Sequence, residues 1–158
     1  MPSIINSDDG VVSGSSGLKT TGGNDGITNF QQNGTTQATI TAAGLFQFNS
    51  GYGSVATAYG CRAWVNFNGT GTVAIRASGN VTSITDNGTG DYTVNFTTSM
   101  PDANYSVVGV TGGWGSGYNY ATVNVGAGAT PTTSAVRIAT RTAGTFNDEA
   151  AVCISVFR

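Results

Sequence analysis

Carboxylates are the residues of this chain whose type could support catalysis. The 158 residues include no histidine, so Ser-His-Asp and Cys-His arrangements cannot form, and the commonest metal ligand is missing. Two carboxylates could still hydrolyse a glycosidic bond if they faced each other across a sugar, about 5–10 Å apart. Each acid, however, stands in or beside a turn signal, and no spacing favours one pair: Asp8, Asp9, Asp25, Asp86, Asp91, Asp102, Asp148 and Glu149. We therefore expect no catalytic residues and a protein that is not an enzyme.

The segment Asp-Asn-Gly-Thr-Gly-Asp at residues 86–91 contains several side chains with oxygen atoms that could bind calcium. A calcium site is therefore one hypothesis for this segment. An EF-hand loop needs a different spacing and a late glutamate, and both are missing here. A hairpin turn explains every residue of the segment, because Asn-Gly and Gly-Asp pairs supply the positive φ angles of a tight reversal. We expect neither a metal nor a cofactor.

Two cysteines, Cys61 and Cys153, stand near the start and end of the C-terminal part of the chain. One interpretation is a disulfide that ties the first strand of that part to its last strand. The other is a pair of buried thiols, which a reducing cytoplasm favours. Two basic residues, Arg137 and Arg141, are four apart on a predicted strand and share a face, so they could pair with Asp148 or Glu149 beyond the next turn.

An aromatic group lies in and after a Gly-rich segment at residues 111–117. Trp114 is flanked by glycines, Tyr118 and Tyr120 share one face of a predicted strand, and Asn119 stands between them. Such a group could stack on a sugar ring while Asn119 supplies hydrogen bonds, which makes these four residues a candidate glycan or receptor site. Tyr and Trp are also enriched in subunit interfaces, so packing against a neighbouring subunit is the alternative.

The composition restricts both fold and partners. Charged residues make up 9% of the chain, against about 25% in an average soluble protein. Six scattered basic residues and a net charge of −2 argue against binding nucleic acid. No segment approaches the roughly 20 apolar residues of a membrane span, so we expect no membrane insertion. Glycines interrupt every helical periodicity, and the chain is predicted to be all-β.

Alternating residues predict an antiparallel β-sandwich knob over residues 57–158. In residues 59–110 strands are separated by Gly and Asn turns. Ala63, Val65 and Phe67 share one face of the first strand. Tyr92, Val94 and Phe96 share a face after the central hairpin turn, as they do only in a strand. About seven short strands with regular turn signals are typical of a sandwich.

Residues 1–56 are predicted to form an N-terminal attachment arm or intertwined stem. Their apolar residues are too sparse to close a core within one chain, and the one predicted hairpin, which turns at Asn33-Gly34, would be marginal alone. The segment is either a flexible arm or a stem in which three chains wrap together. The apolar residues expected to serve attachment are Ile4, Ile5, Val11, Val12 and Leu18.

Two segments carry a resemblance to a known class of proteins. Residues 63–109, AWVNFNGTGTVAIRASGNVTSITDNGTGDYTVNFTTSMPDANYSVVG, resemble the C-terminal domain of many tailed-phage fibre and virion structural proteins. Residues 5–19, INSDDGVVSGSSGLK, resemble the N-terminal stretch with which such fibre-type proteins often begin. The resemblance implies a small trimeric, lectin-like β-sandwich preceded by a stem that attaches to other virion proteins.

The expected function follows from this resemblance and from the incomplete core of residues 1–56. We expect a non-enzymatic virion structural protein of a tailed phage: a homotrimeric short fibre, spike or decoration subunit on the capsid or the tail. The alternative is a tip module of a tail fibre that binds a host receptor or a host surface glycan. In either case the chain would be made in the host cytoplasm, since its N-terminus has no secretory signal, and would reside in the virion.

Overall fold

The computed structural model describes residues 26–112, 121–126 and 128–158, and within these residues all regular structure is β-strand. The prediction of an all-β chain is confirmed. Contacts within the chain divide it into two compact units, Met1–Ala58 and Tyr59–Arg158. This division falls two residues beyond the boundary expected from the sequence.

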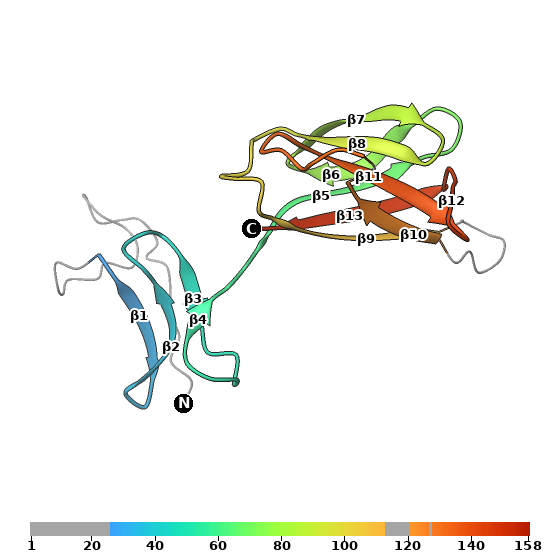
Figure 1. Ribbon diagram of the computed structural model, residues 1–158. Helices are drawn as coiled ribbons and strands as arrows, with labels where there is room; N and C mark the ends of the chain where they lie inside the picture. Colours follow the sequence, from blue (N-terminus) through green and yellow to red (C-terminus); the bar gives the residue numbers. More distant parts are fainter. Residues whose placement is uncertain (1–25, 113–120, 127) are drawn as a thin grey trace, which may run out of the picture. The chain divides into compact units, whose positions relative to one another are not determined.

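The described residues of the first unit, 26–58, form one antiparallel sheet of four strands in chain order (Figure 1). The strands are β1 (Thr28–Gln32), β2 (Thr35–Ile40), β3 (Phe46–Phe48) and β4 (Ala56–Thr57). Asn33 and Gly34 connect β1 to β2 with φ angles of 50° and 75°, as a two-residue hairpin turn requires. The predicted hairpin is therefore present, and β3 and β4 extend it into a sheet that the sequence did not indicate.

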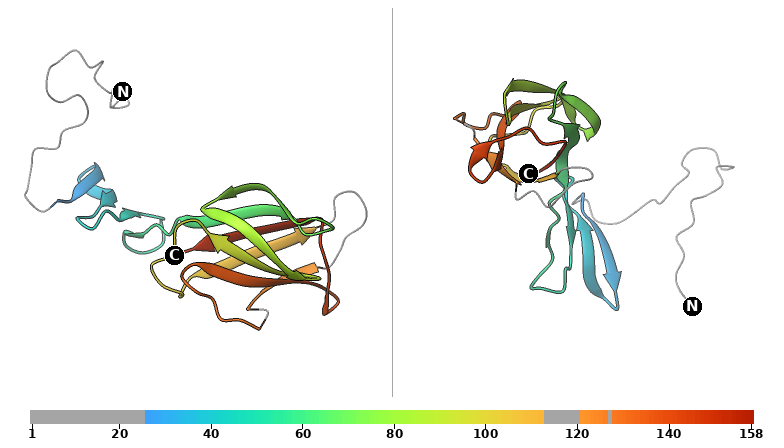
Figure 2. Two further views of the ribbon diagram at one scale, coloured as in Figure 1. Left: turned by 90° about the horizontal axis from the view of Figure 1, so that it is seen from above. Right: turned by 90° about the vertical axis from the view of Figure 1, so that its right-hand side faces the viewer.

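The second unit consists of two antiparallel sheets packed face to face (Figures 1 and 2). One sheet has the order β6-β5-β13-β9, formed by Ala74–Gly79, Cys61–Asn68, Ala151–Phe157 and Ser106–Gly112. The other has the order β10-β11-β8-β7, formed by Ala121–Val125, Ala135–Thr142, Asp91–Phe96 and Val81–Gly88. The short strand β12 (Thr145–Phe146), which the sequence did not indicate, pairs with β11.

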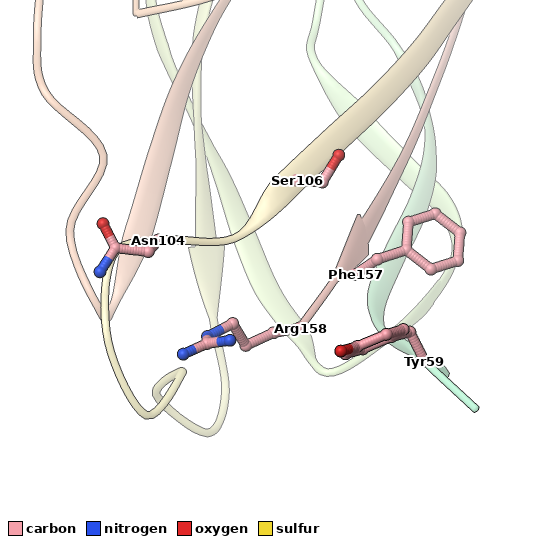
Figure 3. Close-up of a pocket in the computed structure, with 5 residues that line it drawn as sticks. All are labelled: Tyr59, Asn104, Ser106, Phe157 and Arg158. Atoms are coloured by element: carbon pink, nitrogen blue, oxygen red, sulfur yellow. The ribbon is translucent and has the colours of Figure 1, made fainter. Parts of the chain in front are cut away.

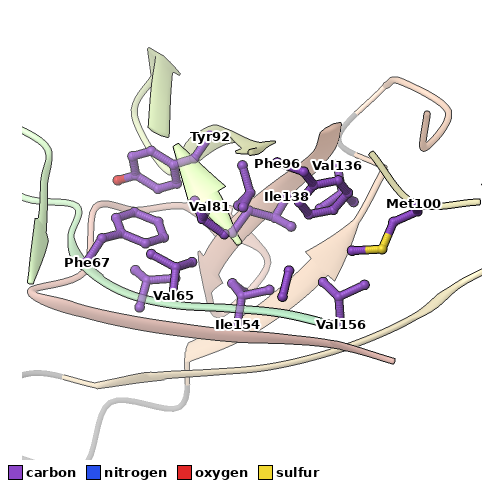
Figure 4. Packing of buried hydrophobic residues seen from close by; sticks show 13 residues of the cluster. Val65, Phe67, Val81, Tyr92, Phe96, Met100, Val136, Ile138, Ile154 and Val156 are labelled. Carbon is purple, nitrogen blue, oxygen red and sulfur yellow. The ribbon is translucent and has the colours of Figure 1, made fainter. Parts of the chain in front are cut away.

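The core of the second unit lies between these sheets and comes from alternate residues of their strands (Figure 4). Both faces predicted from the alternation are buried, the first formed by Ala63, Val65 and Phe67 and the second by Tyr92, Val94 and Phe96. The rings of Phe67 and Tyr92 meet edge to face across the core, with their centroids 5.1 Å apart. The second unit thus has a closed hydrophobic core of its own.

Candidate functional site

The sheet of the first unit has one face lined by large apolar side chains. Phe30 pairs with Ala38, and Ala38 with Phe48, while Ile40 pairs with Phe46, so these five residues share one face. Phe30, Ile40, Phe46 and Phe48 are 40–50% exposed. The rings of Phe46 and Phe48 are stacked nearly parallel, with centroids 6.3 Å apart. We call Phe30, Ala38, Ile40, Phe46 and Phe48 the apolar face.

The opposite face of the same sheet is polar and forms hydrogen bonds within itself. Asn29, Thr39, Gln47 and Thr57 make a row across the four strands. The Thr39 hydroxyl donates to Asn29 Oδ1 at 2.7 Å, and Gln47 Nε2 donates to Thr57 Oγ1 at 3.4 Å. Because the polar groups satisfy one another, this face is suited to water, and among the described residues the apolar face is the side that lacks a covering layer.

The described part of the first unit also lacks the charges that usually protect an open sheet. Residues 26–58 contain no Asp, Glu, Lys or Arg. Within the described part of the chain, β1 and β4 each have a strand on one side only, so the sheet has two open edges. Monomeric β-proteins commonly guard such edges with charged residues, above all lysine. An uncharged open sheet with an exposed apolar face is typical of a surface that another surface covers.

Two sets of residues selected from the sequence lie outside the described residues. They are the attachment residues Ile4, Ile5, Val11, Val12 and Leu18, and the aromatic group Trp114, Tyr118, Asn119 and Tyr120. The prediction of a strand from residue 118 can be compared with the structure only from Ala121, where β10 begins.

The carboxylates of the hairpin β7–β8 make turn and ion-pair contacts. Asp86 Oδ1 accepts a hydrogen bond from the Gly88 amide at 2.9 Å, as the hairpin interpretation requires. Asp91 forms two hydrogen bonds with Arg137, of 2.8 Å to Nε and 2.5 Å to Nη2. The Arg137 guanidinium lowers the pKa of Asp91 below its ordinary value. Within the described residues, no group of three or more His, Cys, Asp or Glu side chains could hold a metal ion.

The expected pairing of the two arginines with Asp148 or Glu149 is wrong. Arg137 binds Asp91 on the adjacent strand β8, because the register of β8 and β11 brings the two onto one face. The Arg141 guanidinium instead lies over the Phe146 ring, 4.1 Å from its centroid.

Asp148 and Glu149 belong to a polar cluster that sequence reasoning missed. The Tyr92 hydroxyl lies 2.7 Å from Asp148 Oδ1, which also accepts a hydrogen bond from the Gly90 amide at 2.6 Å. Burial, and then the Asp148 carboxylate, raises the pKa of Tyr92 far above its ordinary value. Glu149 is 2% exposed and accepts hydrogen bonds from Thr142 and Asn147. These contacts hold the loop before β13 in place.

The two cysteines are free thiols. Cys61 stands opposite Phe157 and Cys153 opposite Asn66 in the ladder of β5 and β13, so the two residues lie at different levels along the same strand pair. The disulfide interpretation is therefore wrong for this structure. The expectation of buried thiols is also wrong for Cys61, which is exposed, whereas Cys153 is partly buried.

A pocket of about 230 Å³ opens at one end of the sheet β6-β5-β13-β9 (Figure 3). It is lined by Tyr59, Asn104, Ser106, Phe157 and Arg158, none of which was selected from the sequence. These residues come from three separate parts of the chain, so no local pattern could have indicated the pocket. No Asp or Glu lines it, which leaves it without the acid pair of a glycosidase.

Comparison with known proteins adds no relative: no family model, no curated protein and no solved structure matches this chain. Across the part of the chain that the structure describes, there is no helix long and apolar enough to cross a membrane.

Proposed function

We propose that this chain is a non-enzymatic structural protein of a tailed-phage virion, a subunit of a homotrimeric short fibre, spike or decoration on the capsid or the tail. The observation that carries the proposal is the apolar face of the first unit, which is one-sided, uncharged and 40–50% exposed at its four large side chains. In this proposal sister copies of the chain cover that face.

The exposed area is of a size that an association surface can use. Four large apolar side chains, each exposed by about two-fifths to one-half, amount to roughly 350 Å² of apolar surface in one patch. Patches of about 300–600 Å² are the largest that ordinary monomers carry, and they are often functional. A standard interface takes about 800 Å² from each partner, of which a little over half is apolar. The apolar face supplies most of that apolar share.

The open edges favour a closed ring of copies over a face-to-face pair. Two sheets stacked about a twofold axis would cover both apolar faces but leave β1 and β4 of each copy as open edges. In a closed ring, β4 of one copy can lie beside β1 of the next, and all apolar faces point to the common axis. Two copies would close an eight-stranded barrel in the same way, and the number three comes from the resemblance to trimeric fibre proteins. The polar row of Asn29, Thr39, Gln47 and Thr57 then faces water.

The virion assignment rests on the resemblance of residues 5–19 and 63–109 to fibre-type phage proteins, and attachment to other virion proteins is assigned to residues 1–19. Negative-stain images of phage particles that carry the chain, with the subunit labelled by an antibody, test this assignment. Labels on the capsid or tail support it, and particles that contain the chain but show no surface label contradict it.

A second candidate function is a host-receptor or glycan-binding tip module. The observation that favours it is the pocket beside Tyr59 and Phe157, which combines aromatic and hydrogen-bonding side chains. A fibre subunit can carry both functions, because the association surface lies in the first unit and the pocket in the second.

A further inference from the structure

We propose that the pocket formed by Tyr59, Asn104, Ser106, Phe157 and Arg158 binds one neutral pyranose ring of a glycan. The inference deepens the second candidate function and places its ligand at a site other than the aromatic group around Trp114. It does not depend on the association of the first unit, since every lining residue belongs to the second.

Strand pairing builds the pocket where three strands meet. Phe157 stands opposite Ser106 of β9 on one side and Cys61 of β5 on the other. Tyr59 comes just before β5, and Asn104 just before β9, so the ends of these segments surround the last residues of β13. Figure 3 shows Tyr59 and Phe157 next to each other on one side of the pocket and Asn104 on the other. The walls are thus apolar on one side and polar on the other.

The aromatic side suits the C–H face of a sugar ring. Tyr59 is 72% exposed, so its ring is accessible to a ligand. Phe157, beside it, is only partly exposed and is held in the ladder of β13. Aromatic rings that present a rigid face to solvent give contact area at a small cost in conformational entropy. Together they form an aromatic wall, with one fixed and one accessible ring, against which the C–H face of one sugar ring can lie.

The polar side offers hydrogen bonds without net charge. Arg158 binds Asp102 through two bonds, of 3.0 Å from Nε and 2.5 Å from Nη2, so its charge is balanced. The backbone N–H of Asn104 donates a hydrogen bond to the same carboxylate at 2.8 Å. This bond fixes the turn that carries the Asn104 side chain. The pair does not use Arg158 Nη1, and the side chains of Asn104 and Ser106 add both donors and acceptors. A balanced arginine favours hydroxyl groups over phosphate or carboxylate.

The size of the pocket limits the ligand to a single ring. Sites for drug-sized molecules usually span about 300–1,000 Å³, and this pocket measures about 230 Å³. A longer glycan would enter with one residue and leave the others in solvent. Affinity for one ring is expected to be in the millimolar range, since small ligands gain a limited free energy per atom. Three copies of the chain in one assembly would raise the apparent affinity for a multivalent glycan by multivalency.

Saturation-transfer NMR on the full chain tests the inference. The probes are the methyl glycosides of glucose, galactose, mannose and N-acetylglucosamine, with methyl glucuronide as the charged comparison. At least one neutral probe should receive saturation, and Tyr59→Ala should weaken its binding at least fivefold while Tyr59→Phe, which keeps the ring, binds like the parent. Tyr52→Ala is the matched control, because Tyr52 is 91% exposed and belongs to the first unit. It should change nothing.

Four results would overturn the inference. They are no transfer to any neutral probe, stronger binding of the glucuronide, binding that survives Tyr59→Ala but is lost in Trp114→Ala, and a Tyr59→Ala variant that alters the oligomeric state but not sugar binding. The last result would make Tyr59 an interface residue. A glycan result of either kind leaves the oligomeric state untouched, so failure here and failure of the assembly proposal are separate outcomes.

Discussion

The hydroxyl oxygen of Tyr92 lies 2.7 Å from a carboxylate oxygen of Asp148, a contact that ties β8 to the loop before β13. The same oxygen is 2.9 Å from the carbonyl of Gly69, in the connection from β5 to β6. One buried phenol therefore joins a strand of one sheet to two loops that lead into the other. The loop contacts make Tyr92 both a core residue and a tether.

We expect Tyr92→Phe to lower the free energy of unfolding of the second unit by about 1–3 kcal/mol. The ring would still pack against Phe67, but the Asp148 carboxylate and the Gly69 carbonyl would lose the one buried O–H donor that they share. Chemical denaturation followed by tryptophan fluorescence measures the change. Tyr52→Phe removes the same hydroxyl from an exposed side chain and should have no effect. Equal stability of Tyr92→Phe and the parent would mean that the tether contributes nothing.

The second unit should also lose stability at alkaline pH. Burial raises the pKa of Tyr92 above its ordinary value, so the folded state keeps a proton that the unfolded state releases near pH 10. This contribution is complete below pH 10 and declines above it, by about 1.4 kcal/mol per pH unit for one such group. Unfolding measured from pH 8 to 11 should show the decline in the parent and a shallower one in Tyr92→Phe. Identical pH profiles of the parent and Tyr92→Phe would contradict the assignment of the alkaline decline to Tyr92.

At acid pH the ion pair of Asp91 and Arg137 should no longer stabilise the folded state. Because Arg137 lowers the pKa of Asp91, the pair stabilises the folded state above the unfolded pKa of about 4 and is lost as the pH falls through the lower, folded value. Asp91→Asn should therefore be less stable than the parent by about 1 kcal/mol at pH 7, and the gap should close at strongly acid pH. Asp86→Asn, which can still accept the turn hydrogen bond, serves as the control. A gap that persists unchanged to the lowest pH would argue against the ion pair.

The thiols give a further prediction. In the native protein Cys61 should react with a maleimide faster than Cys153, because Cys61 is exposed and Cys153 partly buried. Intact mass under non-reducing conditions should show two alkylated cysteines, and a reductant should leave the unfolding temperature unchanged. A mass that corresponds to a disulfide within the chain would contradict the register of β5 and β13.

The sheet faces were predictable from the sequence because strand periodicity is local. Every second residue of 63–67 and of 92–96 is apolar, and those residues form the core. The hairpin at Asn33-Gly34 was predictable for a similar reason, since a two-residue turn needs those residue types. In both cases the signal lies within a few neighbouring positions.

The sites were not predictable, because they depend on register and on distant segments. Arg137 was assigned to acids beyond the next turn, yet its partner Asp91 precedes it by 46 positions and is adjacent only in the register of β8 and β11. The pocket unites Tyr59 with Arg158, which only the antiparallel pairing of β5 with β13 brings together. The apolar residues of the first unit were recognised as too few for a core, but their gathering on one face depended on β3.

Sedimentation velocity of the full chain tests the assembly proposal most directly. At micromolar concentration we predict a single species with three times the 16.0 kDa chain mass. The double variant Phe46→Ser/Phe48→Ser should dissociate, because each substitution removes about 2–3 kcal/mol of apolar burial from the apolar face. Gln47→Ala, on the same strand but on the polar face, should remain trimeric. A parent chain that sediments as a monomer, or a double variant that stays trimeric, would contradict the proposal that sister copies cover this face.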